Sequence, residues 1–213
     1  MSVTVMKTKE RNMPSNTKNK RPTFAVIGAG MSGVLAGIKL KEAGYDFKIF
    51  EKADRVGGTW RENTYPGIAC DVPSHIYSYS FELNPDWTEF TSPGSEIQDY
   101  FEGVAKRYGV EPFIRFNEAV VRCTWIDDQW EIETEKGHIE RFSWIIAATG
   151  ILHHPKIPNI EGLRSFDGPT FHTAQWDHDV QIAGKKVGLI GTGSSGVQIT
   201  AAIAPEVEKL TIF

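Results

Sequence analysis

Two glycine-rich hexapeptides in this sequence have the spacing of a turn that binds a nucleotide pyrophosphate. The first is Gly28-Ala-Gly30-Met-Ser-Gly33, and the second is Gly191-Thr-Gly193-Ser-Ser-Gly196. In such a turn the first glycine makes a tight bend, the second lets the backbone approach the phosphates, and the third lets a helix pack closely against a strand. The helix that follows presents free N–H groups and a positive dipole end. The pair of motifs therefore predicts two dinucleotide sites.

An acidic residue strengthens the prediction for the first site. Glu51 ends the next expected strand, at the distance from Gly28 where a carboxylate can bind ribose hydroxyls. The same offset from Gly191 falls just past Phe213, so the sequence does not indicate NAD or NADP. For either motif the alternative is a glycine turn without a ligand. This alternative has more weight for the second motif, where it would mean a duplicated fold with an inactive second site.

The elements that must position these turns follow from hydrophobic patterning. Short apolar runs and helical spacing predict two βαβ-type units, which are strand 23–27, helix 32–43 and strand 47–50, then strand 186–190, helix 197–204 and strand 207–213. Between them we expect a long loop over 53–93, an antiparallel meander over 116–142 and a buried strand over 143–147. Ser95 and Gln98 have capping-box spacing, which predicts a helix with Ser95 as its N-cap.

Together these elements predict an α/β fold: a Rossmann-like, doubly wound dinucleotide-binding domain with an antiparallel meander, followed by the start of a second Rossmann domain. The expected division is a disordered basic tail over 1–22, a first nucleotide-binding domain over 23–150, a linker over 151–184 and an incomplete second nucleotide-binding domain over 185–213.

Charge and composition exclude several classes of protein. The net charge of −4 divides into +5 for the tail and −9 for the remainder, and so acidic a body is a poor nucleic-acid binder. No apolar stretch has the length of a membrane span. The two cysteines, Cys70 and Cys123, do not make a secreted disulfide scaffold, and no Cys/His cluster has metal-ligand spacing. We therefore expect a cytoplasmic protein without a metal site.

Two further segments carry a specific resemblance. Gly57-Gly-Thr-Trp-Arg-Glu-Asn-Thr-Tyr-Pro-Gly-Ile-Ala-Cys-Asp71 resembles the long fingerprint of class B flavoprotein monooxygenases of the Baeyer–Villiger type. Phe166-Asp-Gly-Pro-Thr-Phe-His-Thr-Ala-Gln-Trp-Asp177 resembles their second fingerprint, in which Phe, Gly, His and Trp recur at these spacings. The likeness covers about 23–213. The family's chains are much longer, so the resemblance implies that this chain is their N-terminal portion.

The resemblance implies a role for each matching residue. FAD would be held by Gly28, Gly30, Ser32, Gly33 and Glu51 at its ADP half, by Gly58, Thr59, Trp60, Asp71 and Tyr77 near the flavin, and by the backbone near Val120 at the adenine. NADPH would be held by Gly191, Thr192, Gly193, Ser194, Ser195, Gly196 and Gln198. Asp71, His172 and Trp176 would serve catalysis. Asp71 would orient an arginine that lies beyond Phe213 in the family, and the other two would couple nicotinamide position to the flavin.

The implied activity is an FAD- and NADPH-dependent Baeyer–Villiger oxidation. One oxygen of O2 is inserted beside a ketone carbonyl, through a flavin peroxide, to give an ester or lactone. An N- or S-oxygenating flavin monooxygenase is one alternative, and Trp176-Asp177 argues against it. A non-catalytic FAD-binding fragment is the other. The partners expected are O2 and a small ketone or heteroatom substrate, with no nucleic acid and no membrane. The oligomeric state and the individual substrate are not indicated.

Overall fold

The computed structural model describes residues 21–152 and 154–213. The predicted disordered tail lies almost wholly outside the described residues. Arg21, where the description begins, donates a hydrogen bond from Nη1 to the carbonyl of Gly44 at 2.8 Å.

A four-stranded parallel sheet forms the centre of the first unit, residues 23–150. Its strand order is β3-β2-β1-β7, with β1 at Thr23–Ile27, β2 at Asp46–Phe50, β3 at Ile114–Arg115 and β7 at Trp144–Ala147. Helix α1, Met31–Glu42, connects β1 to β2. The predicted βαβ unit and the strand before Ala148 are therefore confirmed. The predicted burial of that strand is wrong, because β7 lies at the edge of the sheet and Trp144 is exposed. The two-residue strand β3 carries too little pattern to be found from the sequence.

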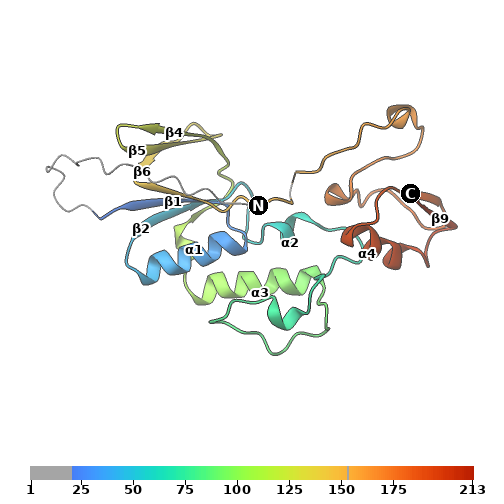
Figure 1. Ribbon diagram of the computed structural model, residues 1–213, viewed down its shortest axis with the longest axis horizontal. Coiled ribbons are helices and arrows are strands. Elements are labelled where there is room, and N and C mark those ends of the chain that lie inside the picture. The colour runs from blue at the N-terminus through green and yellow to red at the C-terminus, as the bar shows by residue number, and fades with distance from the viewer. Residues whose placement is uncertain (1–20, 153) are drawn as a thin grey trace, which may run out of the picture.

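The two faces of this sheet pack against different layers (Figure 1). Val26 and Ile49 belong to a core shared with α1 and with α3, Gly94–Arg107. Their neighbours Ala25 and Phe50 point to the opposite face, because side chains alternate along a strand. There they meet the antiparallel meander of β4 (Val120–Ile126), β5 (Gln129–Thr134) and β6 (Ile139–Phe142). The predicted α/β class with a meander is confirmed.

The start of α3 differs from the capping-box prediction. The helix begins at Gly94 with Pro93 as its N-cap and no side-chain cap, so Ser95 lies inside the first turn. Gln98 donates to the carbonyl of Val56 at 2.7 Å and to Glu102 at 2.7 Å. The capping box was wrong because a tertiary contact uses the Gln98 side chain.

The expected loop over 53–93 contains the short helix α2, Thr59–Glu62, which the sequence analysis did not predict. Single 3₁₀ turns lie at Ser74–Ile76, Glu111–Phe113, Leu163–Ser165 and Thr173–Gln175. These turns break up long irregular stretches without adding a layer to the fold.

The second unit, residues 185–213, is small. Strands β8 (Lys186–Leu189) and β9 (Lys209–Ile212) pair in parallel, and α4 (Ser194–Ile203) connects them. Helix α4 starts three residues earlier than predicted. Ile199 and Ile203 are buried against Leu189 and Tyr65. Figure 1 shows the linker arching from β7 to this unit. Within the described residues, no helix is long and apolar enough to span a membrane.

Candidate functional site

A cleft of about 1070 Å³ lies between the two units, and both glycine turns open into it. The predicted site residues that line it are Gly28, Gly30, Ser32, Glu51, Gly58, Thr59, Trp60, Asp71, Tyr77, Val120, His172, Gly191, Gly193, Ser194, Ser195, Gly196 and Gln198. Three predicted residues, Gly33, Thr192 and Trp176, are not part of its lining. Residues more than 160 positions apart along the chain therefore share one cavity.

The first glycine turn is closely packed, and this explains its glycines. Gly28 has φ +99°, and a Cβ there would lie 2.5 Å from the carbonyl oxygen of Ala148. A Cβ on Gly33 would lie 1.8 Å from the carbonyl oxygen of Gly28. Gly33 therefore lies behind the turn and permits close packing of α1, as predicted from the motif. The backbone of Gly30 approaches Gly58, so the first turn also contacts the start of the long fingerprint.

The Glu51 side chain stabilises the same turn through hydrogen bonds to the backbone. Its side chain is buried, Oε2 accepts from the backbone N–H of Ala29 at 2.7 Å, and Oε1 accepts from Ala53 N–H at 3.0 Å. Arg61 Nη1 lies 3.2 Å from Oε1, and this ion pair is almost fully buried. A carboxylate has about four acceptor positions, so Glu51 can hold the turn and still accept from a ribose hydroxyl in the cleft.

The N-termini of α1 and α4 share features that favour the binding of an anion. Gly30 is the N-cap of α1 and Gly193 the N-cap of α4, each with φ −73° and no side-chain cap. Neither helix has an acidic residue in its first turn. The first turn of each helix thus contributes no negative charge of its own at the positive end of the helix dipole, which makes both turns suitable for a dinucleotide.

An aromatic pair lines the cleft beside the first turn. Trp60 Nε1 donates to the hydroxyl of Tyr77 at 3.2 Å, and the two rings meet edge to face at 5.5 Å. Burial raises the pKa of Tyr77, so its hydroxyl stays protonated at neutral pH. Thr59 begins α2 immediately before Trp60. These side chains form one apolar wall with a polar edge, which suits a planar heteroaromatic ring.

The three predicted catalytic residues have different surroundings. Asp71 is exposed and accepts from Ser194 Oγ at 3.1 Å across the cleft. His172 accepts at Nδ1 from the backbone N–H of Ala174 at 3.1 Å and caps a 3₁₀ turn. Trp176 packs with Phe171, their ring centroids 5.1 Å apart, on the hydrophobic cluster of the second unit. The structure thus brings Asp71 and His172 to the cleft, whereas Trp176 is not part of its lining.

The sequence analysis missed several residues that line the cleft, and two of them make defined contacts. Arg61 is the buried partner of Glu51, and Tyr65 donates to Gln198 at 2.8 Å. Both lie within the long fingerprint, so the motif contained them, but only the folded chain shows what they contact.

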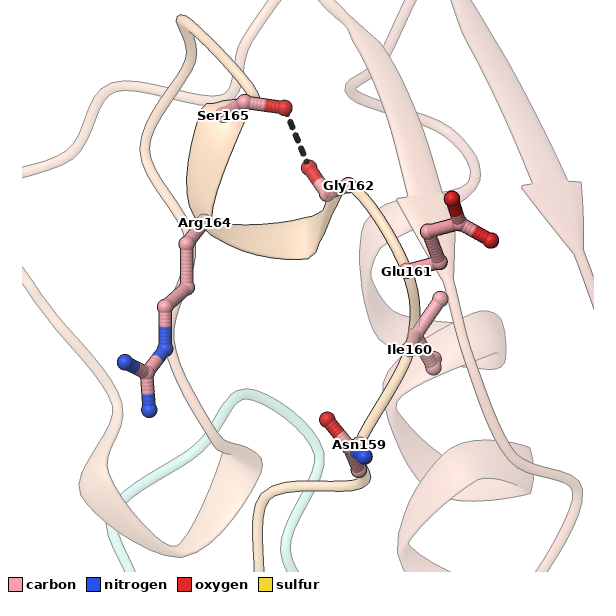
Figure 2. A pocket seen from close by; sticks show the side chains of 6 residues that line it. All are labelled: Asn159, Ile160, Glu161, Gly162, Arg164 and Ser165. Atoms are coloured by element: carbon pink, nitrogen blue, oxygen red, sulfur yellow. Dashed lines mark hydrogen bonds between the residues drawn. The ribbon is translucent and has the colours of Figure 1, made fainter.

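A second hollow, of about 540 Å³, lies in the linker and is lined by Asn159, Ile160, Glu161, Gly162, Arg164 and Ser165. Figure 2 shows Ser165 Oγ bonded to the Gly162 carbonyl, at 2.9 Å, while Arg164 and Glu161 project to different sides of the loop. Its charged side chains do not converge, so the large cleft is the candidate site.

Comparison with known proteins gives a consistent result. The sequence profile described as flavin-binding monooxygenase-like matches residues 20–213. An uncharacterized monooxygenase of Mycobacterium tuberculosis is 52% identical over 193 residues, which are 90% of this chain and 39% of that protein. A Baeyer–Villiger monooxygenase of Streptomyces coelicolor is 48% identical over 192 residues, 89% of this chain and 37% of that protein.

A solved structure extends the comparison to three dimensions. A cyclohexanone monooxygenase mutant from Rhodococcus sp. Phi1 bound to NADP+ superposes with a TM-score of 0.83 at 39% identity. The match covers 92% of this chain and 39% of that structure. The chain therefore spans about two fifths of the length of the relatives it matches.

Proposed function

Since the chain belongs to the flavin-binding monooxygenase-like family of flavin-dependent monooxygenases, we propose that it takes part in an NADPH-dependent Baeyer–Villiger oxidation with FAD as the resident cofactor. One oxygen of O2 is inserted beside a ketone carbonyl, and an ester or lactone results. The single observation that supports this best is that two separate glycine turns, each at an uncapped helix N-terminus, open into one cleft.

The residues fit two dinucleotides at the level of the backbone. A side chain at Gly30 or Gly193 would stand where phosphates must approach, and neither position needs glycine for its φ of −73°. In our proposal residues 23–150 hold FAD, residues 185–213 begin the NADPH domain, and residues 151–184 link the two. The relatives named for Baeyer–Villiger oxidation and for cyclohexanone, together with the NADP+-bound structure, support this assignment.

When bound, NADPH supplies the electrons and FAD the oxygen activation. The chain's own part is binding and orientation. The N–H groups at the start of α1 and α4 bind pyrophosphate, and Glu51 keeps the first turn in shape while accepting a ribose hydroxyl. Trp60 and Tyr77 pack against the flavin end. Val120, which also lines the cleft, is proposed to contact the adenine through its backbone.

Asp71 provides negative charge in the cleft. Its carboxylate is placed to hold and orient a cationic group near the flavin, as the acid of a catalytic triad holds its partner. His172 and Trp176 are proposed to position the linker that joins the two cofactor units rather than to transfer protons. We place the reaction in the cytoplasm, in keeping with Cys70 and Cys123 as free thiols.

Oxygenation of amines or sulfides is the second candidate, because such enzymes also use FAD and NADPH. The tryptophan-aspartate pair at Trp176 and Asp177 favours the ketone reaction.

A substrate panel tests the proposal. The purified protein, loaded with FAD, is given NADPH and O2 with cyclic ketones, sulfides and tertiary amines, and products are identified by mass spectrometry. We expect an ester or lactone from a ketone, one oxygen heavier than the substrate, in proportion to NADPH consumed. Oxides of amines or sulfides as the sole products would support the second candidate instead. NADPH-dependent turnover without any oxygenated product would contradict both.

A further inference from the structure

One face of α4 carries a row of contacts to the first unit. Ser194, Gln198 and Ala202 are four residues apart, so they lie in line along the helix. The segment that faces them is residues 64–71, which we call the docking loop. Figure 1 shows the chain after α2 extending to the side of α4. The docking loop belongs to the long fingerprint, whereas α4 follows the second glycine turn.

Three hydrogen bonds connect the docking loop to this row. The Tyr65 hydroxyl donates to Gln198 Oε1 at 2.8 Å, and Gln198 Nε2 donates to the carbonyl of Ala69 at 2.9 Å. At the N-terminus of the helix, Ser194 Oγ donates to Asp71 at 3.1 Å. The Gln198 carboxamide is thus bonded at both of its ends to the docking loop.

Gly67 brings the loop against the helix backbone. Its φ is +77°, and a Cβ there would lie 2.7 Å from the carbonyl oxygen of Gln198 and 2.8 Å from Ala202 Cβ. Any side chain at this position would push the loop and α4 apart. Tyr65, two residues earlier, is buried with Ile199 and Ile203 of the same helix. The loop and the helix therefore pack at backbone distance.

The docking loop is also fixed to the first unit. Cys70 N–H donates to the Ser92 carbonyl at 2.9 Å, and Gly94 N–H donates to the Ile68 carbonyl at 2.9 Å. The packing of Ile68 on Gly94 adds to these bonds at the start of α3. Because one side of the loop is bonded to the first unit and the other to α4, its position determines where α4 lies.

We propose that the docking loop sets the position of α4, and with it the second glycine turn, relative to the flavin side of the cleft, and that Gln198 is the positioning residue in this contact. The inference rests on the proposed function, in which the two turns hold two cofactors. Gln198 then acts through the placement of α4, since its carboxamide is already bonded to Tyr65 and Ala69.

This role makes a prediction different from direct phosphate binding. A residue that holds a phosphate contributes to NADP+ affinity, whereas a residue that positions α4 contributes to the geometry of electron transfer. A misplacement of about 1 Å can slow a reaction by on the order of 100-fold. Loss of the Gln198 bonds is therefore expected to slow flavin reduction about tenfold or more, with the dissociation constant of NADP+ changed by less than about threefold.

The test uses the FAD-loaded protein with Gln198→Leu and Tyr65→Phe. Gln181→Leu and Tyr45→Phe serve as matched controls, because Gln181 is exposed in the linker and Tyr45 packs on Phe24 at the far end of the sheet. Three quantities are measured: the dissociation constant of NADP+, the amplitude of the flavin difference spectrum at saturating NADP+, and the anaerobic rate of flavin reduction by saturating NADPH. Melting temperature reports folding.

We expect Gln198→Leu to bind NADP+ normally, with a smaller difference spectrum and slower reduction, and Tyr65→Phe to show a weaker form of the same pattern. The double variant should behave like Gln198→Leu alone, because both changes remove one shared bond. If Gln198→Leu does not fold, Tyr65→Phe alone decides. Variants with the unsubstituted protein's spectrum and rate, or with a loss of NADP+ affinity only, would overturn the inference. Failure of the unsubstituted protein to bind FAD or NADP+ would instead contradict the proposed function.

Discussion

The two glycine turns share the same close backbone packing, but they lie in different surroundings. In both, the third glycine lies against the carbonyl of the first, with a Cβ at Gly33 or Gly196 falling 1.8 Å or 2.5 Å from that oxygen. The first turn is enclosed by Ala148 and supported by buried Glu51. A Cβ at Gly191 would meet no atom within 4 Å among the described residues.

The sheets around the two turns also differ in how fully they are covered. The first turn follows β1, an inner strand of a four-stranded sheet that is covered on both faces. The second turn follows β8, one strand of a pair, and lies next to exposed Ile190 and Val197. The comparison teaches that the motif specifies the shape of the turn, while the packing around it decides how firmly the turn is held. We therefore expect substitutions of the closely packed residues of the first turn to affect folding, and the matching substitutions in the second unit to affect ligand binding.

The largest effect is expected from Gly33→Ala. Its methyl group would clash with the Gly28 carbonyl in a turn that cannot move, so the free energy of unfolding should fall by about 3 kcal/mol and FAD should be lost. Gly196→Ala, the matching change in the second unit, should lose NADP+ and retain FAD. Thermal unfolding and cofactor titrations measure both. Gly103→Ala is the control: its Cβ would meet only the movable end of Arg107, at 3.1 Å, so this change within α3 should alter stability by no more than about 1 kcal/mol. Retention of FAD by Gly33→Ala would contradict the packing argument.

Glu51→Gln should have the next largest effect. It removes one of the two carboxylates, Glu51 and Glu62, that pair with buried Arg61, and it turns an acceptor into a donor near the N–H of Ala29. Destabilisation of about 2 kcal/mol is therefore expected, without complete loss of the fold. Denaturant unfolding measures it. Glu42→Gln, which removes an exposed ion pair with Lys39, should cost less than about 1 kcal/mol. Equal effects of the two variants would show that Glu51 does not support the turn.

Gly30→Ala and Gly193→Ala separate ligand binding from folding. A Cβ at Gly30 would make an ordinary 3.5 Å contact with Gly58, and one at Gly193 would meet no described atom within 4 Å. Melting temperatures should stay unchanged, while each variant loses about tenfold in affinity for its own cofactor, FAD or NADP+, equivalent to about 1.4 kcal/mol. Gly188→Ala in β8 is the control without a ligand effect. Unchanged affinities would mean that the phosphates do not approach these glycines.

The smallest expected effect is on the pH dependence of stability, and it concerns the first unit alone. Burial by itself raises the pKa of Glu118, but hydrogen bonds from His138 and Thr134 outweigh it and hold the pKa below its ordinary value of 4.5. A lowered folded-state pKa stabilises the protein above about pH 4.5, and this stability is lost as the pH falls through the folded-state value. Melting curves of Glu118→Gln should therefore depend less on pH in that acid range. Glu135→Gln, at an exposed position, should keep the full dependence.

Local patterns predicted the turns and the strands beside them, because those depend on short-range sequence. Gly28, Gly33 and the alternation in β5 are examples. Contacts made by long side chains across the fold were not predictable. Gln98 left its expected capping role to bond Val56, and the docking of Tyr65 on α4 joins residues 133 positions apart. Only the folded chain brings such residues together.

The central claim is that two cofactors meet in one cleft, and an anaerobic titration tests it most directly. The absorbance spectrum of the FAD-loaded protein is recorded before and after NADPH is added without oxygen. The account predicts a bound-flavin spectrum that bleaches with NADPH, because both glycine turns face the same cavity. A bound-flavin spectrum that NADPH leaves unchanged would contradict it.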